Sequence, residues 1–165
     1  MLTWFAQEQP TSCVAACVRM VLTGFGVVWT EEQIRTIFRR PRLGITLTAA
    51  HARLVHAGAR AALHEDWSLD DLRERVRRGH YPIVGVERHL LGHPPASHAI
   101  VVVQITSRTV HVLDPVEGPQ PQRYGPRRLS SPGRWLGMKP SSWRRLLLVL
   151  PHNLLPRASV PCVLK

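Results

Sequence analysis

The first half of the chain repeats apolar residues at the three- and four-residue spacing of amphipathic helices, and a capping residue precedes each run. We expect four helices, over residues 12–24, 30–39, 46–58 and 68–79. Thr30, with Gln33 three positions later, has the pattern of a capping box. Ser68 precedes acids in the first turn and arginines in the last, an order that the helix dipole favours.

After residue 80 the pattern changes to short β-branched runs bounded by turn residues, which is typical of strands. We expect strands at 81–87, 98–105 and 109–114, and a last one in the Leu-rich run 143–151. The link "TSR" is short enough for a hairpin. Residues 115–142, rich in Pro, Gly, Ser and Arg, are expected to be a long irregular segment. Helices followed by an antiparallel sheet predict an α+β fold.

The composition is that of one globular domain with a basic surface. With 165 residues, 44% of them hydrophobic, the chain is long enough to bury a core. The net charge of +11 comes almost entirely from arginine, since only Lys139 and Lys165 among the 22 basic residues are lysines. The arginines do not form one stripe with aromatic residues, and a GC-rich genome would produce the same bias. Nucleic-acid binding is therefore not favoured.

The sequence has no feature that indicates a membrane span, a disulfide framework or a metal site. Its longest apolar run, "LLLVL", is far shorter than the ~20 residues that cross a bilayer. The N-terminus "MLTWFAQEQP" lacks the basic and apolar regions of a signal peptide. Its 3 cysteines are an odd number, and no Cys or His pair has zinc-finger spacing. We expect a soluble, cytoplasmic protein without a cofactor or metal.

The stretch "FAQEQPTSCVAACVRMVL" places Cys13 in the first turn of a predicted helix, behind Thr11 or Ser12 as cap. Partial positive charge at a helix N-terminus favours the thiolate form of a cysteine, which is its nucleophilic form. The alternative is a buried packing residue, which is the commoner role of a free cysteine. Cys17, one turn later, is expected to pack in the core.

A nucleophilic cysteine needs a base, and the base needs a partner that orients it. His98 opens a predicted strand. If Ser107 centres the hairpin turn, His98 lies opposite position 116, and Asp114 lies diagonally from it on the same sheet face. Alone, His98 could be a surface or core histidine and Asp114 a turn residue. Together with Cys13 they predict a Cys-His-Asp triad.

Attack on a carbonyl also needs donors for the oxyanion that forms. Gln7 and Gln9 lie in the loop before the helix, and either could place an amide beside the thiol. The backbone N–H of Cys13 is a second candidate donor.

These motifs resemble the bacteriocin-processing peptidases. They are papain-like cysteine peptidases that cut leader peptides after a Gly-Gly pair, often as the N-terminal cytoplasmic domain of an ABC exporter. The resemblance rests on Gln, five residues, Cys and "AACVRMVL", then "SHAIVVV" and "VHVLDP", in that order. "LVHAGARAALHED" also resembles the family's helix, Gly turn and short strand. The resemblance implies a papain-like domain over residues 1–150, and residues 151–165 are left as a C-terminal tail. No exporter follows in the sequence, so we expect a stand-alone protein or one that works with a separately encoded partner.

The resemblance also assigns roles to four residues. The family's Gln six positions before the cysteine completes the oxyanion hole, which favours Gln7 over Gln9. By the same match Cys13 attacks, His98 is base and acid, and Asp114 orients the histidine.

The site departs from the family's pattern at two positions. The family usually has Gly directly after the nucleophile and an acid directly before it, whereas this chain has Val14 and Ser12. Val14 adds bulk beside the thiol, with a narrower cleft or a changed substrate preference as the expected effect.

We therefore expect a cysteine peptidase that cleaves a peptide, with a leader peptide cut after small residues such as Gly-Gly as the favoured substrate. An acidic leader would suit the arginine excess, and a separately encoded ABC exporter is a candidate partner. Two alternatives share the scaffold: an acyltransferase, transglutaminase-like enzyme or peptide ligase, and a peptide-binding domain without catalysis. A nucleic-acid binder would need Cys13 to be dispensable.

Overall fold

The computed structural model describes residues 2–125 and the backbone of residues 146–149. In chain order the elements are α1 (Cys13–Gly24), α2 (Glu31–Ile37), α3 (Leu47–His56), β1 (Ala62–Glu65), α4 (Leu69–Arg77), β2 (Ile83–Glu87), the 3-10 helix η1 (Arg88–Leu91), β3 (Ser97–Ile105), β4 (Val110–Leu113), β5 (Gln122–Tyr124) and β6 (Leu146–Val149). The part of the predicted irregular segment that follows residue 125, and the predicted tail at 151–165, lie outside the described residues.

The four predicted helices are confirmed, and the first residue of each predicted range is the N-cap. The Thr30 hydroxyl accepts a hydrogen bond from the Gln33 N–H at 3.1 Å, and the Gln33 side chain accepts one from the Thr30 N–H at 2.8 Å. Ser68 and Asp71 make the same reciprocal pair at the start of α4, and the Thr46 hydroxyl caps α3. These caps satisfy backbone donors that have no partner within the helix.

The strands form one antiparallel sheet in the order β1-β6-β2-β3-β4-β5, as far as the described residues show. The predicted last strand is confirmed as β6, which pairs with both β1 and β2. The prediction of an irregular segment from residue 115 is wrong at Gln122–Tyr124, because β5 pairs there with β4. Three residues are too few for an alternating pattern to be visible in a sequence.

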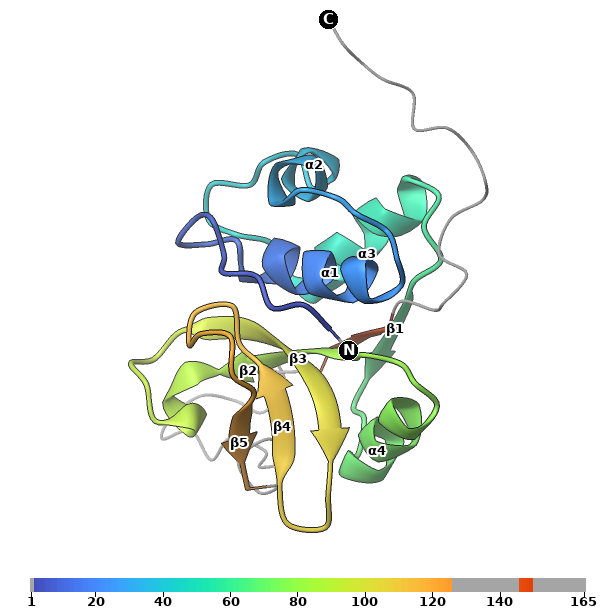
Figure 1. Cartoon of the computed structure of the whole chain (residues 1–165). Helices are drawn as coiled ribbons and strands as arrows, with labels where there is room; N and C mark the ends of the chain where they lie inside the picture. Colours follow the sequence, from blue (N-terminus) through green and yellow to red (C-terminus); the bar gives the residue numbers. More distant parts are fainter. Residues whose placement is uncertain (1, 126–145, 150–165) are drawn as a thin grey trace, which may run out of the picture.

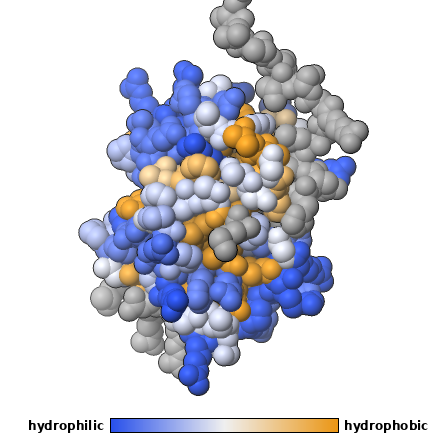
Figure 2. All heavy atoms as spheres, viewed as in Figure 1, coloured by the Kyte–Doolittle hydropathy of each residue, from blue (hydrophilic) through white to orange (hydrophobic). Residues whose placement is uncertain are grey.

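Helices cover both faces of this sheet (Figure 1). On one face, α1, α2 and α3 pack against alternate residues of the central strands, such as Ile83, Ala99 and Val101. On the other face, Leu72 of α4 packs with Val84, Ile100 and Val102, which are the intervening residues. Both faces of β2 and β3 are therefore buried, which explains their unbroken apolar runs. Figure 2 shows apolar atoms gathered across the middle of the viewed face, with hydrophilic residues above and below them.

The β3–β4 hairpin contains a bulge that changes its register. Val101 pairs with Leu113, as predicted, but Gln104 pairs with His111 nearer the turn. The predicted register is thus confirmed at the open end of the hairpin and wrong by one residue near the turn, because β3 carries one extra residue. The open end is where β3 begins and β4 ends.

Within the part of the chain that the structure describes, no helix has the length and apolar character needed to cross a membrane.

Candidate active site

Cys13 is the first residue of α1, and it is partly exposed. Ser12 occupies the N-cap position, but its side chain makes no capping hydrogen bond, so the prediction of a side-chain cap is wrong. The Ser12 hydroxyl instead accepts from the Gln9 N–H at 3.0 Å and donates to the Gln9 carbonyl at 2.9 Å. Thr11 does not replace it, because its hydroxyl donates to the Arg42 carbonyl at 3.2 Å. The first turn of α1 therefore carries neither a side-chain cap nor an acidic residue.

His98 and Asp114 meet at the open end of the hairpin. His98 Nε2 lies 2.8 Å from Asp114 Oδ1, and their exposed fractions are 7% and 0%. The same carboxylate oxygen accepts a hydrogen bond from the Val116 N–H at 2.8 Å. Because Asp114 accepts from Nε2, the other ring nitrogen of His98, Nδ1, is left for a second partner.

Cys13 lies close enough to His98 to affect the charge of the histidine. Burial lowers the pKa of His98, but hydrogen bonds to Asp114 and Cys13, with the charges of both groups, outweigh it and raise the pKa to about 9. Burial likewise raises the pKa of Asp114, but the hydrogen bond and charge of His98 hold that pKa below its usual value. The site thus favours an imidazolium beside a carboxylate at neutral pH.

The N-terminal segment runs along the site and is bound to the residues that follow β4. Trp4 Nε1 donates to the Asp114 carbonyl at 2.7 Å, and the Gln7 N–H donates to the Pro115 carbonyl at 3.1 Å. The first contact links residues 110 positions apart, and the second places Gln7 next to the chain that carries Asp114. Sequence reasoning missed Trp4, since no spacing rule connects it to Asp114.

The two candidate glutamines differ in their surroundings. Gln7 is partly buried and Gln9 is exposed. Gln7 Nε2 donates to the Gln9 carbonyl at 2.9 Å, while Gln7 Oε1 is buried without a hydrogen-bond partner among the described residues. Gln9 contributes its backbone, because its carbonyl also accepts from Ser12. Gln7 is therefore the glutamine with a buried side-chain atom, its Oε1.

Cys17 and Val14 belong to the core beneath the site. Cys17 is fully buried, and its thiol donates to the Ala99 carbonyl of β3 at 3.3 Å. Burial, followed by the charge of Cys13, raises the pKa of Cys17 well above its usual value. The predicted packing role of Cys17 is confirmed. Val14 is also buried in the same cluster, so its side chain packs inside rather than at the surface.

A second group of charged residues lies behind the carboxylate. The Arg88 charge contributes to the lowered pKa of Asp114, and Arg88 forms an ion pair with Glu117 at 2.8 Å. His93 Nε2 lies 3.5 Å from the same Glu117 carboxylate. Sequence reasoning missed this group because Arg88 and Glu117 are brought together only by the fold. Among the described residues, no set of three or more potential ligands is placed to hold a metal ion.

Residues 2–124 match the model of the Peptidase C39 family. The chain belongs to this family. Peptidase C39 membership confirms the predicted family and makes the protein a cysteine peptidase of papain-like fold. The predicted stand-alone form stays a prediction. No curated protein matches the chain as a relative.

Solved structures share the Peptidase C39 fold at low sequence identity. The peptidase domain of Streptococcus ComA, a bifunctional ABC transporter involved in quorum sensing, is 16% identical, with a TM-score of 0.69 over 92% of this chain and 99% of that one. A double-glycine-motif protease from an AMS/PCAT transporter, solved with its leader peptide, is 16% identical, with a TM-score of 0.65 over 92% of each chain. A putative C39-like peptidase from Bacillus anthracis is 11% identical, with a TM-score of 0.63 over 89% of this chain and 94% of that one.

Proposed function

We propose that this cysteine peptidase cleaves a leader peptide through a triad of Cys13, His98 and Asp114. The observation that supports it best is the 2.8 Å contact from His98 Nε2 to Asp114 Oδ1, with Cys13 as the other partner of the same histidine. A base held between a thiol and a buried carboxylate is the arrangement that nucleophilic catalysis requires. Cys17 has no such arrangement, because it is fully buried and its thiol donates to the Ala99 carbonyl.

The reaction follows from these positions. The Cys13 thiolate attacks the scissile carbonyl carbon, and the carbonyl oxygen becomes an oxyanion. The C–N bond then breaks as the His98 imidazolium gives its Nδ1 proton to the leaving amine, which leaves a thioester on Cys13. Water attacks the thioester, and His98 accepts one of its protons. The intermediate then expels the Cys13 thiolate and releases the carboxylic acid, which loses its proton to the solvent, so the thiolate and imidazolium are restored. Asp114 keeps the proton of the histidine on Nε2 throughout.

Two donors are available for the oxyanion. The backbone N–H of Cys13 lies in the first turn of α1, which has no side-chain cap. Gln7 Nε2 carries two hydrogens, and the contact with the Gln9 carbonyl uses one of them. The second hydrogen is the one we assign to the oxyanion. Loss of one such donor typically lowers kcat by about 10²–10³-fold.

The proposed substrate is a leader peptide cut after small residues such as Gly-Gly. It is supported by the family and by the structural neighbour described as a double-glycine-motif protease. An ABC exporter as partner and a cytoplasmic location belong to the same proposal, since the ComA domain comes from an ABC transporter.

An acidic leader is the form of substrate that the surface near Cys13 favours. The loop after α2 exposes Arg39 and Arg42, together with Arg40, which pairs with Glu32 at 2.7 Å. The Arg42 carbonyl binds Thr11, two residues before the nucleophile. Exposed charges of this kind attract an acidic peptide and are screened by salt. We expect the KM for an acidic leader to rise between 0.05 and about 0.5 M salt. A KM that stays constant over this range would contradict the acidic-leader proposal.

Peptide cleavage by purified protein tests the function directly. Reporter peptides with Gly-Gly, and matched peptides with Val-Val, are incubated with the protein and with the variants Cys13→Ala and Cys17→Ala. We expect cleavage after Gly-Gly alone, its loss in Cys13→Ala, and its retention in Cys17→Ala, because the Cys17 thiol is buried and bonded to Ala99. Transfer of the acyl group to an added amine in preference to water would indicate the acyltransferase alternative. Binding without turnover would indicate a non-catalytic domain.

A further inference from the structure

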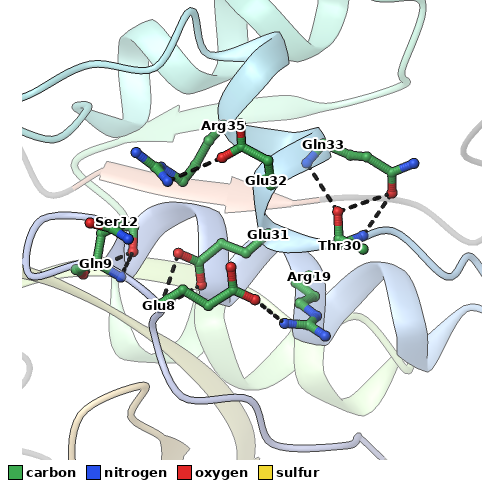
Figure 3. A network of polar contacts seen from close by, with 9 residues as sticks. All are labelled: Glu8, Gln9, Ser12, Arg19, Thr30, Glu31, Glu32, Gln33 and Arg35. Carbon is green, nitrogen blue, oxygen red and sulfur yellow. Dashed lines mark hydrogen bonds and ion pairs between the residues drawn. The ribbon is translucent and has the colours of Figure 1, made fainter. Parts of the chain in front are cut away.

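A buried carboxylate lies next to the loop that precedes the nucleophile. Glu31, the first residue of α2, has an exposed fraction of 0%. Its two oxygens lie 3.1 and 3.0 Å from the backbone N of Glu8, so both accept the same N–H. Figure 3 shows the Glu31 carboxylate directed from α2 toward Glu8, whereas Glu32, the next residue, points toward Arg35.

Stability alone does not explain this carboxylate. A buried charge loses its hydration, and an apolar residue of similar volume is usually at least as stable in such a place. The N-terminus of α2 offsets part of the cost, but it would do so equally for a carboxylate turned outward, as Glu32 is. What the inward orientation adds is a fixed position for the Glu8 N–H.

That N–H belongs to the peptide unit that follows Gln7. On its other side, the Gln7 N–H is bound to the Pro115 carbonyl at 3.1 Å. The two peptide units that flank the Gln7 Cα are therefore held from opposite directions, by α2 and by the chain after β4. With the backbone fixed at both sides, the direction in which the Gln7 side chain leaves it is fixed as well.

We propose that Glu31 is a positioning residue for the oxyanion donor Gln7. It acts through the Glu8 N–H and has no contact with Cys13 or His98 in the hydrogen bonds of the described residues. The catalytic part of this inference depends on the proposed function, in which Gln7 Nε2 stabilises the oxyanion. The structural part, that Glu31 holds the loop, does not depend on it.

The catalytic test is a double-mutant cycle. We expect Glu31→Leu to lower kcat about 10-fold or more with little change in KM, and Gln7→Ala to lower it about 10²–10³-fold. In the Gln7→Ala background, Glu31→Leu should change kcat less than about twofold, because its effect passes through Gln7. Glu31→Gln keeps one oxygen as acceptor and should stay within a few-fold of wild type. Glu32→Leu, on the same helix, is the matched control and should leave kcat unchanged.

Alkylation and hydrogen exchange separate this role from a general loss of structure. The rate of Cys13 alkylation by iodoacetamide, and its pH profile, should be the same in Glu31→Leu as in wild type, since the Cys13–His98 contact is intact. Hydrogen exchange of the Glu8 amide should become at least about 10-fold faster in Glu31→Leu, with the amides of β3 unchanged.

Several results would overturn the inference. If Glu31→Leu lowers kcat by the same factor in the Gln7→Ala background as in wild type, Glu31 has a separate, structural role. An unchanged exchange rate of the Glu8 amide would show that Glu31 does not hold the loop, whether or not the protein cleaves peptides. If wild type cleaves no peptide, the proposed function fails, and the exchange measurement alone decides the structural part. Should Glu31→Leu not fold, Glu31→Gln gives the same exchange test with a smaller expected change.

Discussion

The charge state of His98 leads to the most direct prediction about this site. Asp114→Asn removes the carboxylate charge while keeping a side chain of nearly the same shape, which can still accept from the Val116 N–H. In wild type the pKa of His98 rises from 6.5 to about 9 against the effect of burial. At about 1.4 kcal/mol for each tenfold change, this rise favours the imidazolium by about 3 kcal/mol.

We expect Asp114→Asn to remove the larger part of this stabilisation. Among the interactions that raise the pKa of His98, the hydrogen bond to Asp114 is the strongest, followed by the contact with Cys13. The pKa of His98 should therefore fall from about 9 toward its ordinary value of 6.5, since burial then acts against Cys13 alone. NMR titration of the ring protons of His98 between pH 5 and 10 measures it, with the exposed His56 as internal reference.

The same interaction predicts how stability depends on pH. Measurements in the Cys13→Ala background prevent the thiol from titrating with the histidine. A pKa that is higher in the folded state stabilises the fold fully below about pH 6.5, and this contribution is lost as the pH rises through the folded value. The unfolding free energy from urea titrations should therefore decline above pH 6.5, by no more than about 3 kcal/mol. Asp114 is ionised in both states in this window, so it adds no slope of its own.

Two results would refute this reasoning. One is a His98 pKa that stays near 9 in Asp114→Asn, which would mean that the carboxylate does not hold the proton. The other concerns Cys13→Ala and the double variant that also carries Asp114→Asn. If both lose the same unfolding free energy above pH 6.5, a group other than His98 titrates in that pH range.

Three further changes have definite expected outcomes. In Cys13→Ala the NMR pKa of His98 should fall less than in Asp114→Asn, because the thiol is the weaker of the two hydrogen-bond partners; a larger fall would contradict the assigned order. Trp4→Phe should lower kcat more than it raises KM, because the indole bond to the Asp114 carbonyl aligns the triad; a change in KM alone would indicate a substrate contact. Thr46→Ala should reduce the unfolding free energy by about 1 kcal/mol in urea titrations and leave kcat unchanged, because it removes only the cap of α3.

The sequence determined the four helices and the central strands to within a few residues, because their signals are local. Thr30 and Ser68 mark where two helices begin. Thr30 and Gln33 form the expected reciprocal hydrogen bonds, and Ser68 caps α4 as expected, with Asp71 as a partner that was not predicted. The β-branched runs indicate the central strands, because β-branched residues are enriched in strands. Even the diagonal from His98 to Asp114 follows from a short hairpin link and the two-residue period of a strand.

Only the tertiary structure decided which side chains turn toward the site. Glu31 and Glu32 are adjacent acids in the first turn of one helix, and the sequence gives no reason to expect one buried on Glu8 and the other paired with arginines. Ser12 has the residue type and place of a cap, yet its hydroxyl binds Gln9. Such choices depend on which segments the packed core brings within hydrogen-bonding distance. The spacing of residues along the chain contains the local preferences but not that three-dimensional proximity.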